Sequence, residues 1–154
     1  MKVKWFKSEL CVVCSAGGHL SEAIDALKMT TLEKFFVTFG EPHVRMMLKD
    51  EQVYYVLDPH KSIFKYVLNI IQSFVLVLKT RPKVIFSTGA GIAIATCLFG
   101  KLIGSKVIFL ESGARITTAS MTGRLMYYFA DEFIVQWEPL LKHYPNAKYY
   151  GSLI

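Results

Sequence analysis

Three short segments of the sequence combine glycines with side chains that can bind an anion or transfer a proton. They are Ser15-Ala-Gly-Gly-His-Leu at 15–20, Ser87-Thr-Gly-Ala-Gly-Ile at 87–92 and Leu110-Glu-Ser-Gly-Ala-Arg at 110–115. Each segment follows or overlaps a short apolar run of the kind that forms a buried strand. Glycine lets backbone approach a ligand closely, and a helix that starts beside it presents free N–H groups to an anion.

In the first segment, Ser15, Gly17 and Gly18 precede His19, whose imidazole can accept a proton near neutral pH. The glycine spacing differs from the G-x-G-x-x-G fingerprint of dinucleotide-binding proteins, and no Gly-Lys-Ser/Thr follows as in a P-loop. We therefore interpret the segment as an anion-binding loop with a candidate general base. The alternative is a tight strand-to-helix turn that His19 merely caps.

The second segment repeats this arrangement with Gly89 and Gly91, and it adds the hydroxyl groups of Ser87 and Thr88. Two such segments at strand ends are stronger evidence for a ligand than one. The alternative is close packing of a helix on a strand, which explains one glycine better than both.

The third segment places a carboxylate, Glu111, four residues before a guanidinium, Arg115. Arg115 can hold a phosphate through its planar fork of donors. Glu111 can position His19, take a proton itself, or pair with Arg115. The alternative is a purely structural ion pair between the two.

Apolar runs alternate with amphipathic segments along the whole chain, which predicts an α/β fold with a parallel sheet, as one Rossmann-like domain over residues 1–154. We expect strands at 10–14, 35–39, 53–57, 84–86, 107–110 and 133–136, with a short one near Tyr149. We expect helices at 20–29, 43–49, 62–79, 92–103, 120–130 and 139–143. Ligands of open parallel sheets bind beyond the carboxyl ends of the strands, where all three segments would lie.

Composition narrows the possible partners. The 154 residues carry a formal net charge of +6, which favours an anionic partner. We find no nucleic-acid-binding signature and no metal-ligand cluster, so we expect neither partner. Cys11 and Cys14 lie three apart in a strand and therefore face opposite sides, which predicts buried, reduced cysteines. Without an apolar run of about 18 residues or a signal peptide, we expect a cytoplasmic protein.

Residues 62–79 form an apolar helix interrupted by a few polar residues and surrounded by basic ones. Its apolar arc is too wide for a helix with one buried stripe. We therefore predict a membrane-facing helix that contacts lipid headgroups peripherally. The residues of this predicted membrane surface are Lys61, Phe64, Lys65, Lys79 and Arg81. The alternative is an ordinary core helix.

The three segments, in this order, resemble a family of subunits of two-chain GT-B glycosyltransferases. The resemblance is strongest in the strings at 109–116, 120–125, 130–139 and 144–151. The eukaryotic members are the membrane-anchoring subunits of the UDP-N-acetylglucosamine transferase that acts on dolichyl-diphosphate-linked N-acetylglucosamine. The bacterial members are small capsule and exopolysaccharide biosynthesis proteins. The family is also similar to the N-terminal half of MurG-type enzymes.

The resemblance implies an acceptor-side subunit that is inactive alone and acts on a polyprenyl-diphosphate-linked saccharide. A separate donor-binding subunit would hold most of the UDP-sugar, because this chain would lack the donor-binding half. The resemblance implies no tightly bound cofactor and no metal. It makes His19 or Glu111 the candidate base. The positions it places near the acceptor diphosphate are Ser15, Gly17, Gly18, Ser87, Thr88, Gly89, Gly91 and Arg115.

The sequence lacks the N-terminal membrane-spanning helix of the eukaryotic subunits, so we expect peripheral attachment to the cytoplasmic face of the membrane. Two other functions remain open. One is a non-catalytic scaffold that recruits and stimulates a partner transferase at the membrane. The other is a stand-alone nucleotide- or flavin-binding Rossmann protein, in which Glu41 would contact the ribose.

Overall fold

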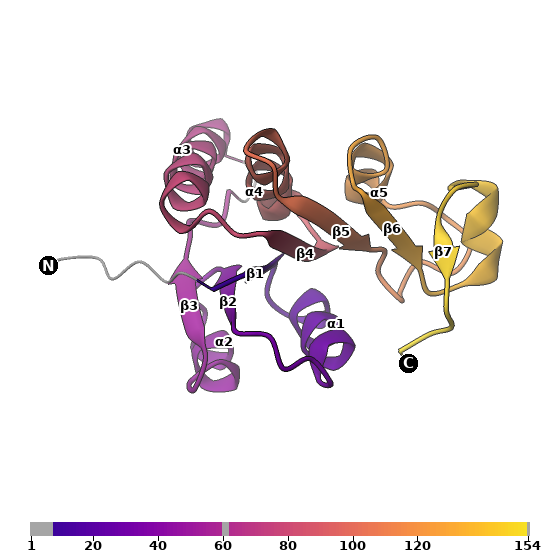
Figure 1. Ribbon diagram of the computed structural model, residues 1–154, viewed down its shortest axis with the longest axis horizontal. Coiled ribbons are helices and arrows are strands. Elements are labelled where there is room, and N and C mark those ends of the chain that lie inside the picture. The colour runs from indigo at the N-terminus through magenta and orange to yellow at the C-terminus, as the bar shows by residue number, and fades with distance from the viewer. Residues whose placement is uncertain (1–7, 60–61, 154) are drawn as a thin grey trace, which may run out of the picture.

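The computed structural model describes residues 8–59 and 62–153, and it contains a seven-stranded, all-parallel sheet. The strand order is β3-β2-β1-β4-β5-β6-β7 (Figure 1). The strands are β1 Leu10–Cys14, β2 Lys34–Thr38, β3 Gln52–Tyr55, β4 Val84–Gly89, β5 Lys106–Leu110, β6 Glu132–Val135 and β7 Lys148–Tyr149. The predicted α/β fold with a parallel sheet is confirmed.

Helices cover both faces of the sheet (Figure 1). One layer contains α3, α4 and α5, and the other contains α1 and α2. Their bounds are α1 Gly18–Leu27, α2 Pro42–Met47, α3 Ile63–Thr80, α4 Gly91–Leu102 and α5 Met121–Met126, and a short 3-10 helix covers Glu138–Lys142. Each predicted helix is present. The largest difference is at α5, which ends four residues early because the chain turns at Tyr127.

The core has two parts, one on each face of the sheet. Cys11 packs in the part under α3 and α4, whereas Cys14 packs in the part under α1 and α2. All three cysteines are free and buried, so the prediction of reduced core cysteines is confirmed. Burial raises the pKa of the Cys14 thiol to about 12, and a hydrogen bond with Thr88 offsets part of that rise.

The order in which strands are added to the sheet reverses between β1 and β4. Strands β2 and β3 extend from one side of β1, whereas β5, β6 and β7 extend from the far side of β4. Such a switch point leaves a crevice beyond the carboxyl ends of the two central strands. The register shifts between Val13 and Cys14, so Cys14 pairs with Gly89 at the end of β4. This topology brings the three segments of interest to one edge.

Helix α3 has an unusual distribution of side chains. Its buried residues include the polar Asn69, Ser73 and Thr80, and the Ser73 hydroxyl accepts a hydrogen bond from Thr96 Oγ1 on α4 at 3.1 Å. Its exposed residues are mostly apolar: Ile63, Phe64, Tyr66, Val67, Ile70, Ile71, Phe74, Val75 and Leu78. Helix α3 thus packs Leu76 and Val77 into the core and leaves most of its other apolar side chains exposed. Of the helices that the structure describes, α3 alone has the length and apolar composition to cross a bilayer.

Candidate functional site

A pocket of about 310 Å³ lies beyond the carboxyl ends of β1, β4 and β5. That volume suits a small polar ligand or the head of a larger one. All three segments singled out in the sequence contribute to its wall. The lining residues are His19, Thr88, Gly89, Ala90, Ser112, Ala114, Arg115, Ser120, Met121 and Thr122.

His19 is held against the end of β4 by its backbone and its ring. Thr88 Oγ1 donates a hydrogen bond to the His19 carbonyl oxygen at 2.6 Å. Gly89 has a φ of +118°, and a Cβ built on it would lie 3.3 Å from Cε1 of the imidazole. A side chain at 89 would therefore strain the backbone and press on the ring. Thr88 therefore anchors the backbone of His19, and Gly89 leaves room for its ring.

The N-termini of α1 and α4 both lie at this edge. Gly17 precedes α1 with a φ of 77°, and Ala90 precedes α4 with a φ of 74°, a conformation that costs a non-glycine residue energy. Neither helix has a side-chain hydrogen bond capping its first turn. Free N–H groups and the helix dipole favour negative charge at such ends. The edge is thus electrostatically suited to an anion.

Arg115 also lines the pocket, on the exposed part of the segment that follows β5. The structural Glu111–Arg115 ion pair is not found among the described residues. The Glu111 carboxylate is instead buried and bonded to Ser112, Ser120 and Tyr144. The Arg115 guanidinium remains available to a ligand in the pocket.

Glu111 is 1% exposed, and both its carboxylate oxygens accept hydrogen bonds. Oε1 accepts from the backbone N–H of Ser112 at 3.1 Å. Oε2 accepts from the Ser120 backbone N–H at 3.2 Å, the Ser120 hydroxyl at 3.0 Å and the Tyr144 hydroxyl at 2.9 Å. A buried carboxylate satisfied by four donors stabilises the segment it belongs to. This placement argues against the predicted proton transfer by Glu111, which does not line the pocket.

The network around Glu111 draws on all four sequence strings in which the resemblance is strongest. Burial raises the pKa of the Tyr144 hydroxyl, and the neighbouring Glu111 carboxylate raises it further. The Glu111 carbonyl oxygen accepts from Gln136 Nε2 at 3.1 Å, and Trp137 Nε1 donates to the Gly113 carbonyl at 2.7 Å. Residues from the strings near 111, 120, 136 and 144 therefore hold one loop in place beside the pocket.

The remaining predicted site residues do not line the pocket. Ser87 belongs to β4, is buried in the core and accepts a hydrogen bond from the Gly89 N–H, so it does not reach the pocket. Ser15 donates to the adjacent Ala16 carbonyl. Gly17 and Gly18 are exposed at the start of α1. Gly91 lines a neighbouring apolar hollow, where a Cβ would lie 2.5 Å from the Tyr66 hydroxyl.

One residue near the pocket was not predicted. Glu22 lies on α1, one turn after His19, and its carboxylate accepts hydrogen bonds from the loop after β5. The i,i+3 spacing from His19 is the signal in the sequence that points to it, because such residues are neighbours on a helix.

Apolar hollows adjoin the pocket on the α3–α4–α5 face. One shares Met121 and Thr122 with the pocket and continues along α4 and α5 past Leu125 and Tyr128. A smaller one, about 190 Å³, lies between α3 and α4 and shares Tyr66, Gly91 and Ile94 with the first. Of the exposed apolar residues of α3, Tyr66 lines both hollows and Ile70 lines the smaller one. The polar pocket therefore adjoins apolar hollows on this face.

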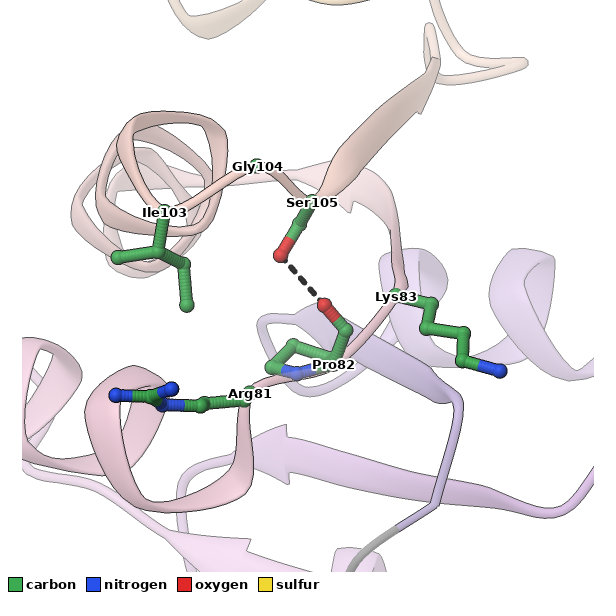
Figure 2. A pocket seen from close by; sticks show the side chains of 6 residues that line it. All are labelled: Arg81, Pro82, Lys83, Ile103, Gly104 and Ser105. Atoms are coloured by element: carbon green, nitrogen blue, oxygen red, sulfur yellow. Dashed lines mark hydrogen bonds between the residues drawn. The ribbon is translucent and has the colours of Figure 1, made fainter.

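A separate hollow lies at the opposite, amino edge of the sheet, before β4 and β5 (Figure 2). Its wall includes Arg81, which follows α3 in a left-handed conformation, and Ile103, which follows α4. Ser105 Oγ donates to the Pro82 carbonyl at 2.6 Å, while Lys83 points away from Arg81 (Figure 2). This hollow and the pocket therefore lie at opposite ends of the strands.

The predicted membrane surface falls on α3 and its C-terminal end. Phe64 is 71% exposed, and Lys65, Lys79 and Arg81 are exposed as well. Lys61 lies outside the described residues. Over the part of the chain that the structure describes, no group of three or more His, Cys, Asp or Glu side chains is arranged to bind a metal ion.

The fold is that of one Rossmann-like half of GT-B proteins. MurG of Acinetobacter baumannii superposes with a TM-score of 0.72 at 14% identity, over 94% of this chain and 45% of that one. The UDP-N-acetylglucosamine 2-epimerase of Rickettsia bellii superposes with a TM-score of 0.71 at 9% identity, over 94% of this chain and 44% of the enzyme.

The sequence identifies the family within this class. Residues 56–153 match the family described as "Oligosaccharide biosynthesis protein Alg14 like", and the chain belongs to that family. It is 40% identical over 99 residues to the UDP-N-acetylglucosamine transferase subunit ALG14 of Candida albicans, covering 60% of this chain but 45% of the Candida protein. The same subunit of Yarrowia lipolytica is 27% identical over 95% of this chain and 81% of its own length. The chain thus spans less than half of the Candida relative.

Proposed function

We propose that the chain is the acceptor-side subunit of a heteromeric UDP-sugar glycosyltransferase that acts on a polyprenyl-diphosphate-linked saccharide in glycan or polysaccharide assembly. The observation that carries the proposal is the polar pocket with His19 and Arg115 in its wall, which opens through Met121 and Thr122 onto an exposed apolar surface. An amphiphilic acceptor with an anionic head would match a polar pocket that lies next to an apolar surface.

The diphosphate of the acceptor would bind in the pocket. Arg115 supplies a guanidinium that can bind phosphate oxygens in a bidentate manner. The N-termini of α1 and α4, beside Gly17, Gly18 and Ala90, supply backbone N–H groups and the positive ends of two helix dipoles. The isoprenyl units nearest the diphosphate would then lie along the hollows between α3, α4 and α5.

His19 is the candidate base of the transfer. Its imidazole would take the proton of the attacking acceptor hydroxyl while the hydroxyl oxygen bonds to the anomeric carbon of the donor. The bond between that carbon and the UDP oxygen breaks, and UDP leaves with the electron pair. We propose that a separate subunit binds most of the UDP-sugar. Relatives named as UDP-N-acetylglucosamine transferase subunits make UDP-N-acetylglucosamine the first donor to test.

The exposed apolar side chains of α3 support contact with a membrane surface, and we propose a peripheral position on its cytoplasmic face. Lys65 and Lys79 on α3, with Arg81 after it, would contact anionic headgroups. Bacterial capsule and exopolysaccharide assembly are settings that this proposal includes. We also propose that transfer needs no cofactor and no metal ion. Adding EDTA to the assay tests the need for a metal ion.

The experiment is a paired assay with membrane lipid extract and UDP-sugars. It compares this chain alone, the candidate partner transferase alone, and both together. Transfer only in the combined reaction supports the proposal. Equal transfer by the partner alone, also with a soluble acceptor mimic, would instead make this chain a membrane scaffold. A tightly bound nucleotide or flavin that copurifies with this chain alone would instead favour a stand-alone nucleotide- or flavin-binding protein.

A further inference from the structure

The carboxylate of Glu22 connects the first turn of α1 to the loop after β5. Its Oε1 accepts a hydrogen bond from the Gly113 backbone N–H at 2.7 Å and from the Ser112 hydroxyl at 3.2 Å. A backbone N–H can only donate, so the atom at the Oε1 position has to be an acceptor. These two bonds fix the rotamer of Glu22 and therefore the direction of its second oxygen.

That second oxygen, Oε2, is directed toward His19. It lies 4.0 Å from Nδ1 of the imidazole, and both atoms are buried. Neither has a hydrogen-bond partner, and only Thr38 Oγ1 shares that condition among the described side chains. A buried polar atom without a partner costs about 1–3 kcal/mol. A small rotation of the ring satisfies both atoms with one bond, and catalytic contacts are often long until a ligand binds.

We propose that Glu22 is the positioning residue that holds His19 in the tautomer with its proton on Nδ1. The Nδ1–H would donate to Glu22 Oε2, which leaves Nε2 as the unprotonated nitrogen. The His19 side chain is 32% exposed although Nδ1 is buried, so the ring presents its other nitrogen to a ligand in the pocket. The catalytic part of this inference rests on the proposed function of His19.

The geometry makes the effect of Glu22→Gln specific. The glutamine carbonyl oxygen must occupy the Oε1 position, because the Gly113 N–H donates there. The amide NH₂ then faces His19 Nδ1 as a donor, and it favours the tautomer with the proton on Nε2. The substitution keeps the size and the loop bonds of Glu22 while reversing the polarity of the contact with the ring. A base with its acceptor nitrogen already protonated cannot take the acceptor proton.

The first measurement is the tautomer itself, read from the ¹⁵N chemical shifts of the His19 imidazole in the full chain. Wild type should carry its neutral-form proton on Nδ1, and Glu22→Gln should move it to Nε2. Asp25→Asn, on the exposed side of the same helix, is the matched control and should leave the spectrum unchanged. An unchanged tautomer in a folded Glu22→Gln protein overturns the inference, whatever the activity.

The second measurement uses the complex with the donor-binding subunit. Glu22→Gln should lower kcat by about 100-fold or more with little change in KM for the acceptor, as expected for a misoriented base. In a His19→Ala background, the same substitution should have almost no further effect. Additive losses in the double mutant would overturn the inference, because they would mean that Glu22 acts without His19.

The two measurements separate the inference from the proposed function. A tautomer shift in the isolated chain supports the Glu22–His19 contact even where no transfer is detected for the wild-type complex. That combination would overturn the glycosyltransferase role. Transfer by the wild-type complex with an unaffected Glu22→Gln variant would overturn the positioning role alone.

Discussion

Gly123 lies directly against the carboxylate of Glu111: a Cβ atom at position 123 would be 2.1 Å from Glu111 Oε2 and 2.6 Å from the Tyr144 hydroxyl. The Gly123 N–H also donates to the Ser120 hydroxyl, which in turn donates to the same carboxylate. The glycine of the Ser-Met-Thr-Gly string is therefore a packing requirement of the buried acid. The carboxylate cannot move away without losing the bonds that hold the loop.

Gly123→Ala should destabilise the protein by about 2–4 kcal/mol, because a methyl group displaces a buried carboxylate from its donors. Chemical unfolding followed by circular dichroism measures the change. Gly18→Ala is the matched control, since a Cβ there has no neighbour within 4 Å, and its effect should stay below about 1 kcal/mol. A neutral Gly123→Ala would contradict this packing.

His19→Ala should lower kcat of the two-subunit complex by about 10²–10⁴-fold, because the acceptor hydroxyl loses its base. Complex formation, measured by size-exclusion chromatography, should be unaffected. His43→Ala removes an exposed imidazole on α2 that pairs with Glu41, and it should leave kcat unchanged. Unchanged turnover in the His19 variant would remove His19 from the mechanism.

Ile71→Glu on the exposed side of α3 should weaken binding to anionic vesicles, since a charge placed at the lipid boundary opposes insertion. Cosedimentation with vesicles measures the bound fraction. Met46→Glu adds the same charge at an exposed apolar residue of α2, on the other layer, and should bind like wild type. Equal losses in both variants would indicate a general effect of net charge and not a membrane-facing α3.

Asp131→Asn should remove a pH-dependent part of the stability. Burial raises the pKa of the Asp131 carboxyl, but hydrogen bonds from Lys101 and from the Val107 N–H, together with nearby positive charges, lower it below its ordinary value overall. A carboxyl whose pKa is lower in the folded state stabilises the protein at pH values above its unfolded-state pKa of about 3.9. This stabilisation is lost as the pH falls through the folded-state pKa.

We therefore expect Asp131→Asn to be less stable than wild type at pH 7, by less than about 1 kcal/mol because solvent screens the exposed pair with Lys101, with the difference disappearing near pH 2. Urea unfolding at a series of pH values measures both. A constant difference between the two proteins across that range would show that the carboxylate charge is not its source.

The sequence predicts the sheet well because its strands are short apolar runs buried on both faces, a pattern that few other elements share. The sequence predicts less well where the role of a residue depends on the direction of its side chain. Ser87 looked like a loop donor, but β4 continues to Gly89 and turns the hydroxyl into the core. Glu111 was a candidate base or a partner of Arg115, and only Tyr144 and Ser120 show that its carboxylate is a buried acceptor.

The glycines pointed to this edge of the sheet because glycine adopts a positive φ at little cost, which a tight turn into a helix often needs. Gly17 and Gly89 do have positive φ, as such a loop requires. Glu22 was missed because the i,i+3 spacing from His19 alone does not distinguish it from a solvated surface acid. The groups that bind its carboxylate, in Ser112 and Gly113, are 90 and 91 residues away in sequence.

The outward apolar side of α3 also affects how the chain behaves in water. A soluble domain normally closes its helical layer with another layer or with charged residues, whereas here the layer remains open along Ile63, Ile70, Phe74 and their neighbours. Detergent micelles or bilayers that bind the folded chain and not the unfolded one must raise its unfolding temperature by mass action. The proposed contact of α3 with a membrane therefore predicts a thermal stability that depends on the chain and the amphiphile together.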